Sequence, residues 1–277
     1  MSTSTRRIAG APALGHDVQM LVSIPPMDEA RRLIQGPFGR ALHEAVHQYV
    51  HPLWWFDRGR GGAGRIRNGT TFFVNCGGGL FGVTAGHVYD EFAAQAEHGV
   101  RCRVGGGPTW DLRPRLISRG EETDIATYRV TSEEVRQLGG IVLTGYQDEW
   151  PPKPPENERG SMFAGFPAVE RKLLGEHRIE WGIYSALGIA SSVSDRDVSC
   201  LLERHEWVPT PGAVEPEEGY DLGGMSGAPM LSLVIVRGTL VTWRLAGVLY
   251  ECSKKLEEIV RAARADVIRI DGTVVGQ

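Results

Sequence analysis

The sequence lacks the features that indicate a membrane protein or a nucleic-acid-binding protein. No apolar run reaches the roughly 18 residues that a membrane-spanning helix needs. Pro12 and Gly15 interrupt any signal-peptide core near the start of the chain. The net charge of −4 gives no electrostatic reason to expect nucleic acid or an anionic membrane as a partner. We therefore expect a soluble, cytoplasmic protein.

Metal and redox motifs built on cysteine are also missing. The four cysteines lie far apart and form no Cys-x-x-Cys pair, so the sequence predicts neither a zinc knuckle nor a redox motif. We expect buried free thiols and no cofactor. With 277 residues, of which 42% are hydrophobic, the chain can bury one large core or two small ones.

A glycine-flanked serine stands in the stretch Gly223–Pro229, which reads Gly-Gly-Met-Ser-Gly-Ala-Pro. Glycine tolerates backbone angles that a side chain forbids, and it leaves amide N–H groups free to point at an oxyanion. Ser226 is therefore a candidate nucleophile. The same pattern is also typical of an ordinary turn before a strand.

Two further motifs precede this serine. His87 lies in Val-Thr-Ala-Gly-His-Val and Asp124 lies in Thr-Asp-Ile-Ala, which gives the order His, Asp, Ser. The intervals are 37 residues (124 − 87) and 102 residues (226 − 124). The three motifs, their order and their spacing resemble those of the chymotrypsin/trypsin-like serine peptidases, in particular the bacterial intracellular type. The resemblance extends from about Asn68 to Ala265.

The resemblance implies a mostly β fold of two six-stranded antiparallel barrels, with an N-terminal helical extension and a C-terminal helix. It implies that His87, Asp124 and Ser226 form a catalytic triad for peptide-bond hydrolysis. The backbone N–H groups of Gly224 and Ser226 would form the oxyanion hole. It also implies a protein or peptide substrate, and no metal.

The chain departs from the family pattern at two positions. Val88 follows His87, so the disulfide that secreted members place there is missing, which agrees with a reducing compartment. Met225 replaces the acidic residue that usually helps to set the oxyanion loop. A catalytically silent or partner-activated binding module is therefore the alternative, with the N-terminal helix as its docking element.

The specificity pocket is predicted from the same resemblance. Its floor would lie about six residues before the nucleophile, at Tyr220, with Asp221 beside it and Glu251 near its wall. These acidic side chains predict a preference for arginine or lysine before the scissile bond.

A second possible centre is the run His43-Glu44-Ala45-Val46-His47, which matches the zincin pattern of two histidines one helical turn apart. No glutamate follows before Glu91 to serve as a third ligand. A zinc peptidase is therefore the less favoured hypothesis, and a histidine stripe on an amphipathic helix is the simpler interpretation.

Periodicity and turn signals divide the chain into five segments. They are an N-terminal arm and helix (1–60), a first barrel (61–147), a proline-rich linker (148–160), a second barrel (161–251) and a C-terminal helix and tail (252–277). Within them we expect one long helix at Met27–Tyr49, a helix at Tyr89–Glu97, strands at Asp111–Ile117 and Ile125–Val130, and a helix at Lys254–Ala265.

Overall fold

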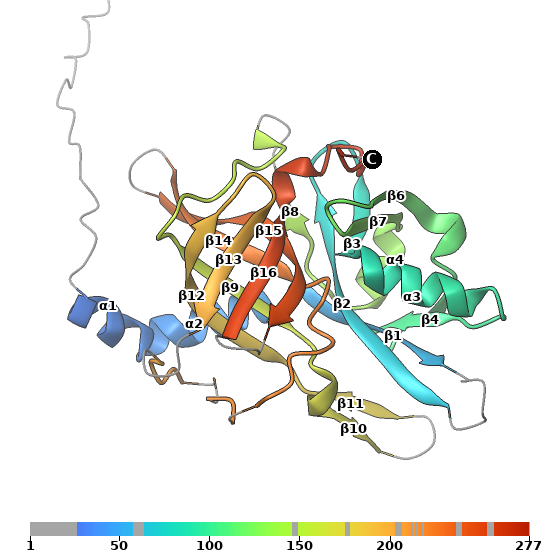
Figure 1. Cartoon of the computed structure of the whole chain (residues 1–277), viewed down its shortest axis with the longest axis horizontal. Helices are drawn as coiled ribbons and strands as arrows, with labels where there is room; N and C mark the ends of the chain where they lie inside the picture. The colour runs from blue at the N-terminus through green and yellow to red at the C-terminus, as the bar shows by residue number, and fades with distance from the viewer. Residues whose placement is uncertain are drawn as a thin grey trace, which may run out of the picture.

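Two β structures lie side by side in the computed structural model (Figure 1), and both are built from antiparallel strands with one exception. The structure describes residues 27–57, 64–145, 149–174, 178–202, 207–211, 213, 215–217, 219–236, 240–253 and 258–276. One β structure is an open eight-stranded sheet and the other is a closed six-stranded barrel. The predicted mostly β class is confirmed.

The first sheet has the order β5-β4-β1-β2-β3-β7-β6, and β8 pairs in parallel with the end of β2. The predicted closed barrel is therefore wrong for the described residues, in which β5 and β6 are unpaired edges. The strand expected at 111–117 is also wrong, because Pro114 lacks an N–H and the chain there forms the 3₁₀ turn Arg113–Arg115. The strands are β1 (Val50–Asp57), β2 (Arg65–Asn75), β3 (Leu80–Ala85), β4 (Cys102–Val104), β5 (Thr109–Trp110), β6 (Leu116–Gly120), β7 (Ile125–Arg129) and β8 (Leu143–Thr144).

Strand β1 corrects the predicted start of the first β unit at residue 61. It pairs with β2 from Val50↔Phe72 to Asp57↔Arg65, and its other edge pairs with β4. Leu53 and Trp55 of this strand are buried in one apolar cluster with Phe92. The strand was hidden in the sequence because Pro52 and His51 break its apolar pattern.

The second β structure closes in the order β12-β13-β16-β15-β14-β9. The predicted C-terminal helix is wrong, because residues 258–264 form β16 between β13 and β15. Residues 254–257 lie outside the described part of the chain. The strands are β9 (Gly160–Gly165), β12 (Tyr184–Val193), β13 (Asp197–Leu202), β14 (Pro229–Val236), β15 (Leu240–Ser253) and β16 (Glu258–Arg264), and β10 (Arg171–Leu173) pairs with β11 (Ile179–Trp181) as a separate hairpin.

Helices cover the outside of both units (Figure 1). The single helix expected at 27–49 is split at Gly36 and Pro37 into α1 (Met27–Ile34) and α2 (Pro37–His47), since proline is favoured in the first helical turn. α2 packs on β9 and β12 of the barrel. α3 (Gly86–Ala96) lies on the first sheet, starts three residues earlier than expected, and is followed in the chain by the short α4 (Ser132–Gln137). None of the helices in the described ranges has the length and apolar character of a membrane span.

Three apolar clusters form the core. One fills the first sheet beneath α3 and includes Trp55 and Phe92. Another fills the barrel and includes Phe163 and Met225. The third lies between the two units, where Phe72 of β2 belongs to the same cluster as residues of β9, β14 and β15. The active-site candidates come from both units, so this shared cluster sets their relative position.

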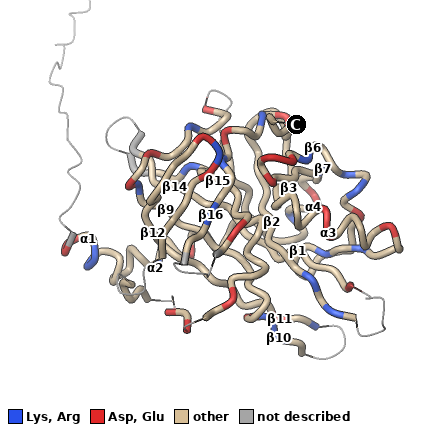
Figure 2. The backbone as a smooth tube through the Cα atoms, in the orientation of Figure 1, with Lys and Arg blue, Asp and Glu red and all other residues tan. Residues whose placement is uncertain are grey.

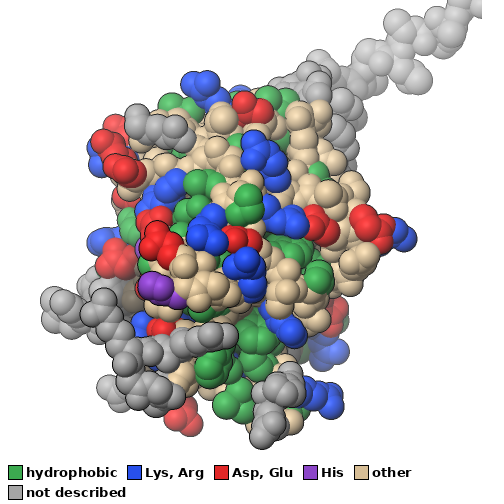
Figure 3. All heavy atoms as spheres, turned by 90° about the vertical axis from the view of Figure 1, so that its right-hand side faces the viewer, with side chains coloured by type: hydrophobic (Ala, Val, Ile, Leu, Met, Phe, Trp, Pro, Cys, Tyr) green, Lys and Arg blue, Asp and Glu red, His purple; other side chains and the backbone are tan. Residues whose placement is uncertain are grey.

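Charges of both signs are found on each of the two β units. Figure 2 shows acidic and basic residues on both β units, although single elements such as α3, with Asp90 and Glu91, carry one sign only. The face that carries α3 and β6 likewise intersperses both signs with apolar side chains in Figure 3. The surface seen there offers no single-sign patch for a polyanion.

Candidate active site

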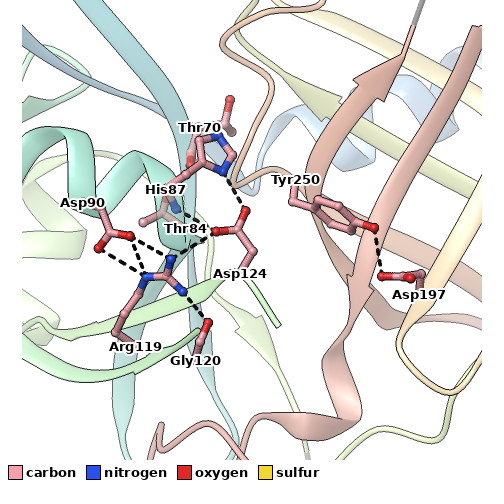
Figure 4. A network of polar contacts seen from close by, with 9 residues as sticks. All are labelled: Thr70, Thr84, His87, Asp90, Arg119, Gly120, Asp124, Asp197 and Tyr250. Atoms are coloured by element: carbon pink, nitrogen blue, oxygen red, sulfur yellow. Dashed lines mark hydrogen bonds and ion pairs between the residues drawn. The ribbon is translucent and has the colours of Figure 1, made fainter. Parts of the chain in front are cut away.

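His87 and Asp124 form a tight pair at the start of α3 (Figure 4). His87 Nδ1 lies 2.6 Å from Asp124 Oδ2, and the His87 backbone N–H donates to Asp124 Oδ1 at 2.8 Å. The hydrogen bond that His87 makes to the Asp124 carboxylate raises the pKa of His87, and burial partly opposes the rise. Because the carboxylate occupies Nδ1, the Nε2 atom is the one left to exchange a proton.

Asp124 also closes the N-terminus of α3. Ala85 stands at the N-cap position without a side-chain cap, and Asp124 supplies the missing acceptors. Its backbone oxygen accepts from Gly86 N at 2.7 Å and its carboxylate accepts from His87 N. A negative side chain is stabilised at a helix N-terminus. Asp124 has a φ of 50°, a left-handed conformation that aspartate tolerates better than most residues. The turn between β6 and β7 is therefore shaped to aim this carboxylate at α3.

Arg119 of β6 lies between Asp124 and Asp90 and contacts both (Figure 4). Its Nη2 is 3.4 Å from Asp124 Oδ1 and 2.7 Å from Asp90 Oδ2. The guanidinium packs against Gly86, where a side chain would collide with it. Its positive charge opposes the rise in the pKa of His87. Neither Arg119 nor Asp90 was predicted from sequence, since neither belongs to a motif.

The serine loop lies against β2, which pairs with β3, the strand that leads to His87. Thr70 N donates to Ser226 O at 2.8 Å, and a Cβ on Gly69 would lie 3.2 Å from that same oxygen and 2.6 Å from Val88 Cγ1. Gly227 has a φ of 91°, and a side chain there would collide with the backbone of Thr70. Because Gly69 and Gly227 have no side chains, the backbone of Ser226 can lie close to β2 and to Val88, the residue after His87.

The loop carbonyls are all occupied by donors from the protein. Gly223 O accepts from Ala168 N at 2.7 Å, and Met225 O accepts from Ala228 N at 3.0 Å. Gly224 O accepts from the hydroxyl of Thr70 at 2.9 Å. Each loop carbonyl is thereby directed into the protein.

The orientation of two loop N–H groups follows from these carbonyls. In a planar trans peptide the N–H points opposite to the C=O of the same unit. The N–H of Gly224 therefore points away from Ala168, and the N–H of Ser226 points away from Ala228. Within the described ranges, neither N–H donates to a protein group. Two unpaired N–H groups beside a serine hydroxyl are the arrangement that stabilises an oxyanion.

Gly224 has no room for a side chain. Its φ is 102°, and a Cβ there would lie 2.5 Å from Asn68 Nδ2 and 2.6 Å from Phe166 O. Asn68 Nδ2 donates to Phe166 O at 2.8 Å, so both neighbours are fixed. The backbone of this loop is therefore held from behind by β2 and by the chain after β9.

Two of the solved structures that align with this chain are proteases. A thermostable serine protease, AL20, from an extremophilic microorganism aligns with 78% of this chain and 91% of its own, at 14% identity and a TM-score of 0.43. The protease Anisep from Arthrobacter nicotinovorans aligns with 82% of this chain and 91% of its own, at 10% identity and a TM-score of 0.42. The chain is similar in structure to serine proteases. No family model and no curated protein matches the sequence. Activity and substrate depend on the site itself rather than on such a likeness.

No hydrogen bond joins His87 to Ser226 among the described contacts. Catalytic hydrogen bonds of this kind are often long in a free enzyme and tighten when substrate binds. The His87–Asp124 hydrogen bond is thus already formed, whereas the hydrogen bond between His87 and Ser226 is not.

The three predicted pocket residues already have protein partners. Tyr220 donates its hydroxyl to Glu170 Oε1 at 2.7 Å. Burial, and then this hydrogen bond, raise the pKa of Tyr220. Asp221 Oδ1 accepts from Gly223 N at 2.9 Å, which ties it to the serine loop. Glu251 forms a 3.0 Å ion pair with Arg261. A basic substrate side chain would therefore have to compete with Arg261 for the carboxylate of Glu251.

The predicted zinc motif is occupied by a different interaction. His43 Nδ1 and His47 Nε2 each lie 2.7 Å from the hydroxyl of Ser185 on β12. Burial lowers the pKa of both histidines, that of His43 to about 4. The part of the chain that the structure describes contains no group of three or more metal-ligating side chains. The two histidines therefore anchor α2 on the barrel.

Proposed function

We propose that the protein is a serine peptidase that hydrolyses peptide bonds through an acyl-enzyme. The observation that carries the proposal is the pair of unpaired N–H groups, on Gly224 and Ser226, next to a serine and a His–Asp pair. A serine in an ordinary turn does not require two neighbouring amides to be directed away from all protein acceptors. The proposal therefore rests on the serine loop more than on the order of the motifs.

The reaction would follow from the geometry. Ser226 Oγ attacks the substrate carbonyl carbon while His87 Nε2 accepts its proton. The carbonyl oxygen becomes an oxyanion, which accepts hydrogen bonds from the N–H groups of Gly224 and Ser226. His87 then donates its proton to the leaving amine, and the carbon–nitrogen bond breaks. Water, activated by His87, releases the acyl group and restores Ser226.

Asp124 serves this cycle without changing its own proton count. Its carboxylate at 2.6 Å holds the proton of His87 on Nδ1 and stabilises the positive imidazole that forms after the first transfer. The turn at Asp124 fixes the ring because the same residue also binds two backbone N–H groups of α3.

A fluorophosphonate probe tests the proposal directly, because it reacts only with an activated serine. We expect the full chain to be labelled and Ser226→Ala to be unlabelled, with a loss of peptidase kcat on the order of 10⁶-fold. Ser232→Ala is the matched control, since that serine is buried in β14 outside the site and should leave labelling unchanged. Labelling of Ser226→Ala at the wild-type rate would exclude Ser226 as the nucleophile.

The open contact between His87 and Ser226 favours one second candidate, a module that is silent until a partner binds. In that case the free chain would not react with the probe, but would react once a peptide ligand or partner protein is added. Loss of peptide hydrolysis on addition of a chelator alone, with no probe labelling, would instead support the zinc hypothesis at His43 and His47.

A further inference from the structure

The serine loop has an apolar residue at its centre. Met225 is fully buried among the apolar side chains of the barrel, in contact with the cluster that includes Phe163 and Ala228. A methionine side chain offers no charge or strong hydrogen bond to fix the peptides on either side of it. A polar side chain that holds the centre of the loop must therefore come from another part of the chain.

Thr70 of β2 supplies this side chain. The residue is fully buried, and every polar atom it has is used. Its N–H donates to Ser226 O at 2.8 Å and its carbonyl accepts from Thr84 Oγ1 at 2.8 Å. Its hydroxyl donates to Gly224 O at 2.9 Å and accepts from Phe166 N at 3.1 Å. One side chain thus joins the serine loop to the segment after β9.

The position of the hydroxyl gives it a specific effect on the oxyanion site. The N–H of Gly224 and the N–H of Ser226 belong to two peptide units, and the Gly224–Met225 peptide lies between them. Thr70 holds the carbonyl of this middle peptide, and Leu222 O holds its N–H at 3.0 Å. Fixing the middle unit at both ends fixes the angle between the two flanking N–H groups.

We propose that the Thr70 hydroxyl is a positioning group that aligns the oxyanion donors of this loop, in place of a polar side chain at Met225. The inference rests on the proposed peptidase function and adds a residue to it. Thr70 acts through the loop backbone and does not itself contact the reacting atoms. Without the hydroxyl, the carbonyl of Gly224 loses its partner and the Gly224–Met225 peptide can rotate.

The test compares three variants. Thr70→Val keeps the shape of the side chain and removes the hydroxyl, whereas Thr70→Ser keeps the hydroxyl. Thr71→Val is the control, because Thr71 is equally buried in the same strand and its hydroxyl contacts Val83 O at 2.7 Å and Tyr128 Oη at 2.6 Å, outside the serine loop. Thermal unfolding of all three variants separates loss of stability from loss of alignment.

We expect Thr70→Val to lower kcat by about 10- to 100-fold, less than the loss of a whole oxyanion donor. KM for the same peptide should change less than about twofold, because misalignment weakens transition-state binding rather than substrate binding. Affinity for a peptide aldehyde, which places an oxyanion in the site, should fall in parallel with kcat. Thr70→Ser should retain most of the wild-type kcat.

Two results would overturn the inference. One is a wild-type kcat and aldehyde affinity in Thr70→Val. The other is an equal loss of kcat in Thr70→Val and Thr71→Val, which would assign the effect to general stability. Failure of the peptidase proposal is distinguishable, because the wild-type chain would then show neither probe labelling nor aldehyde binding, whatever residue stands at position 70.

Discussion

Acidification is predicted to destabilise the contact between α2 and the barrel through His43. The side chain is 4% exposed, and its ring faces the Ser185 hydroxyl that His47 also contacts. The hydroxyl can accept from both rings or donate to one of them, and burial favours the uncharged form of each ring. Burial, and then the nearby charge of His47, lower the pKa of His43 from 6.5 to about 4.

The size and sign of the effect follow from this pKa. Between pH 6.5 and about pH 4 the unfolded chain carries a proton on His43 that the folded chain does not. The free energy of unfolding therefore falls as the pH falls through this window. For a single group with these two pKa values, the loss between pH 7.5 and pH 5 is about 2 kcal/mol. Glu44 on the same helix acts on His47 in the opposite direction, because its charge raises the pKa of that ring.

Urea unfolding at pH 7.5 and pH 5 measures this loss. The wild type and His43→Asn are compared, and the drop in unfolding free energy should be about 2 kcal/mol smaller in the variant. His98→Asn is the control, because His98 is exposed at the end of α3 and should leave the pH dependence unchanged. The reasoning is refuted if His43→Asn and the wild type lose the same free energy between the two pH values.

Two further predictions concern the candidate active site. Arg119→Gln removes a positive charge that opposes the raised pKa of His87, so the acid limb of kcat/KM should move to higher pH; Arg115→Gln, which breaks an ion pair away from the site, should not move it. An unmoved acid limb in Arg119→Gln would show that this charge does not reach His87. Gly224→Ala should lower kcat about 10²- to 10³-fold, as for a lost oxyanion donor, because a Cβ there displaces the loop. Gly106→Ala, where a side chain meets open space, should behave as wild type, and a fully active Gly224→Ala would contradict the assigned loop geometry.

The local sequence pattern was sufficient to predict a strand or helix where one periodicity dominated. The run Ile125–Val130 was predicted as a strand, and β7 (Ile125–Arg129) covers it to within one residue. The end of the chain shows the limit. Ile259 and Val260 suit either a helical face or a strand, and the outcome was decided by β13 and β15, which leave a gap in the barrel that only a sixth strand fills. Tertiary pairing, absent from any local window, overrode the helical interpretation.

Tertiary contacts also explain why the sequence alone made Met225 look like a defect in the oxyanion loop. A motif shows which residue is missing from a loop, but the group that compensates for it can lie anywhere in the chain. Thr70 is 154 residues from Gly224, and its hydroxyl reaches that carbonyl only because the core between the two β units sets β2 against the barrel. Substitutions that loosen this shared core should therefore reduce kcat before they unfold the chain, since alignment of the oxyanion donors depends on a contact between the two units.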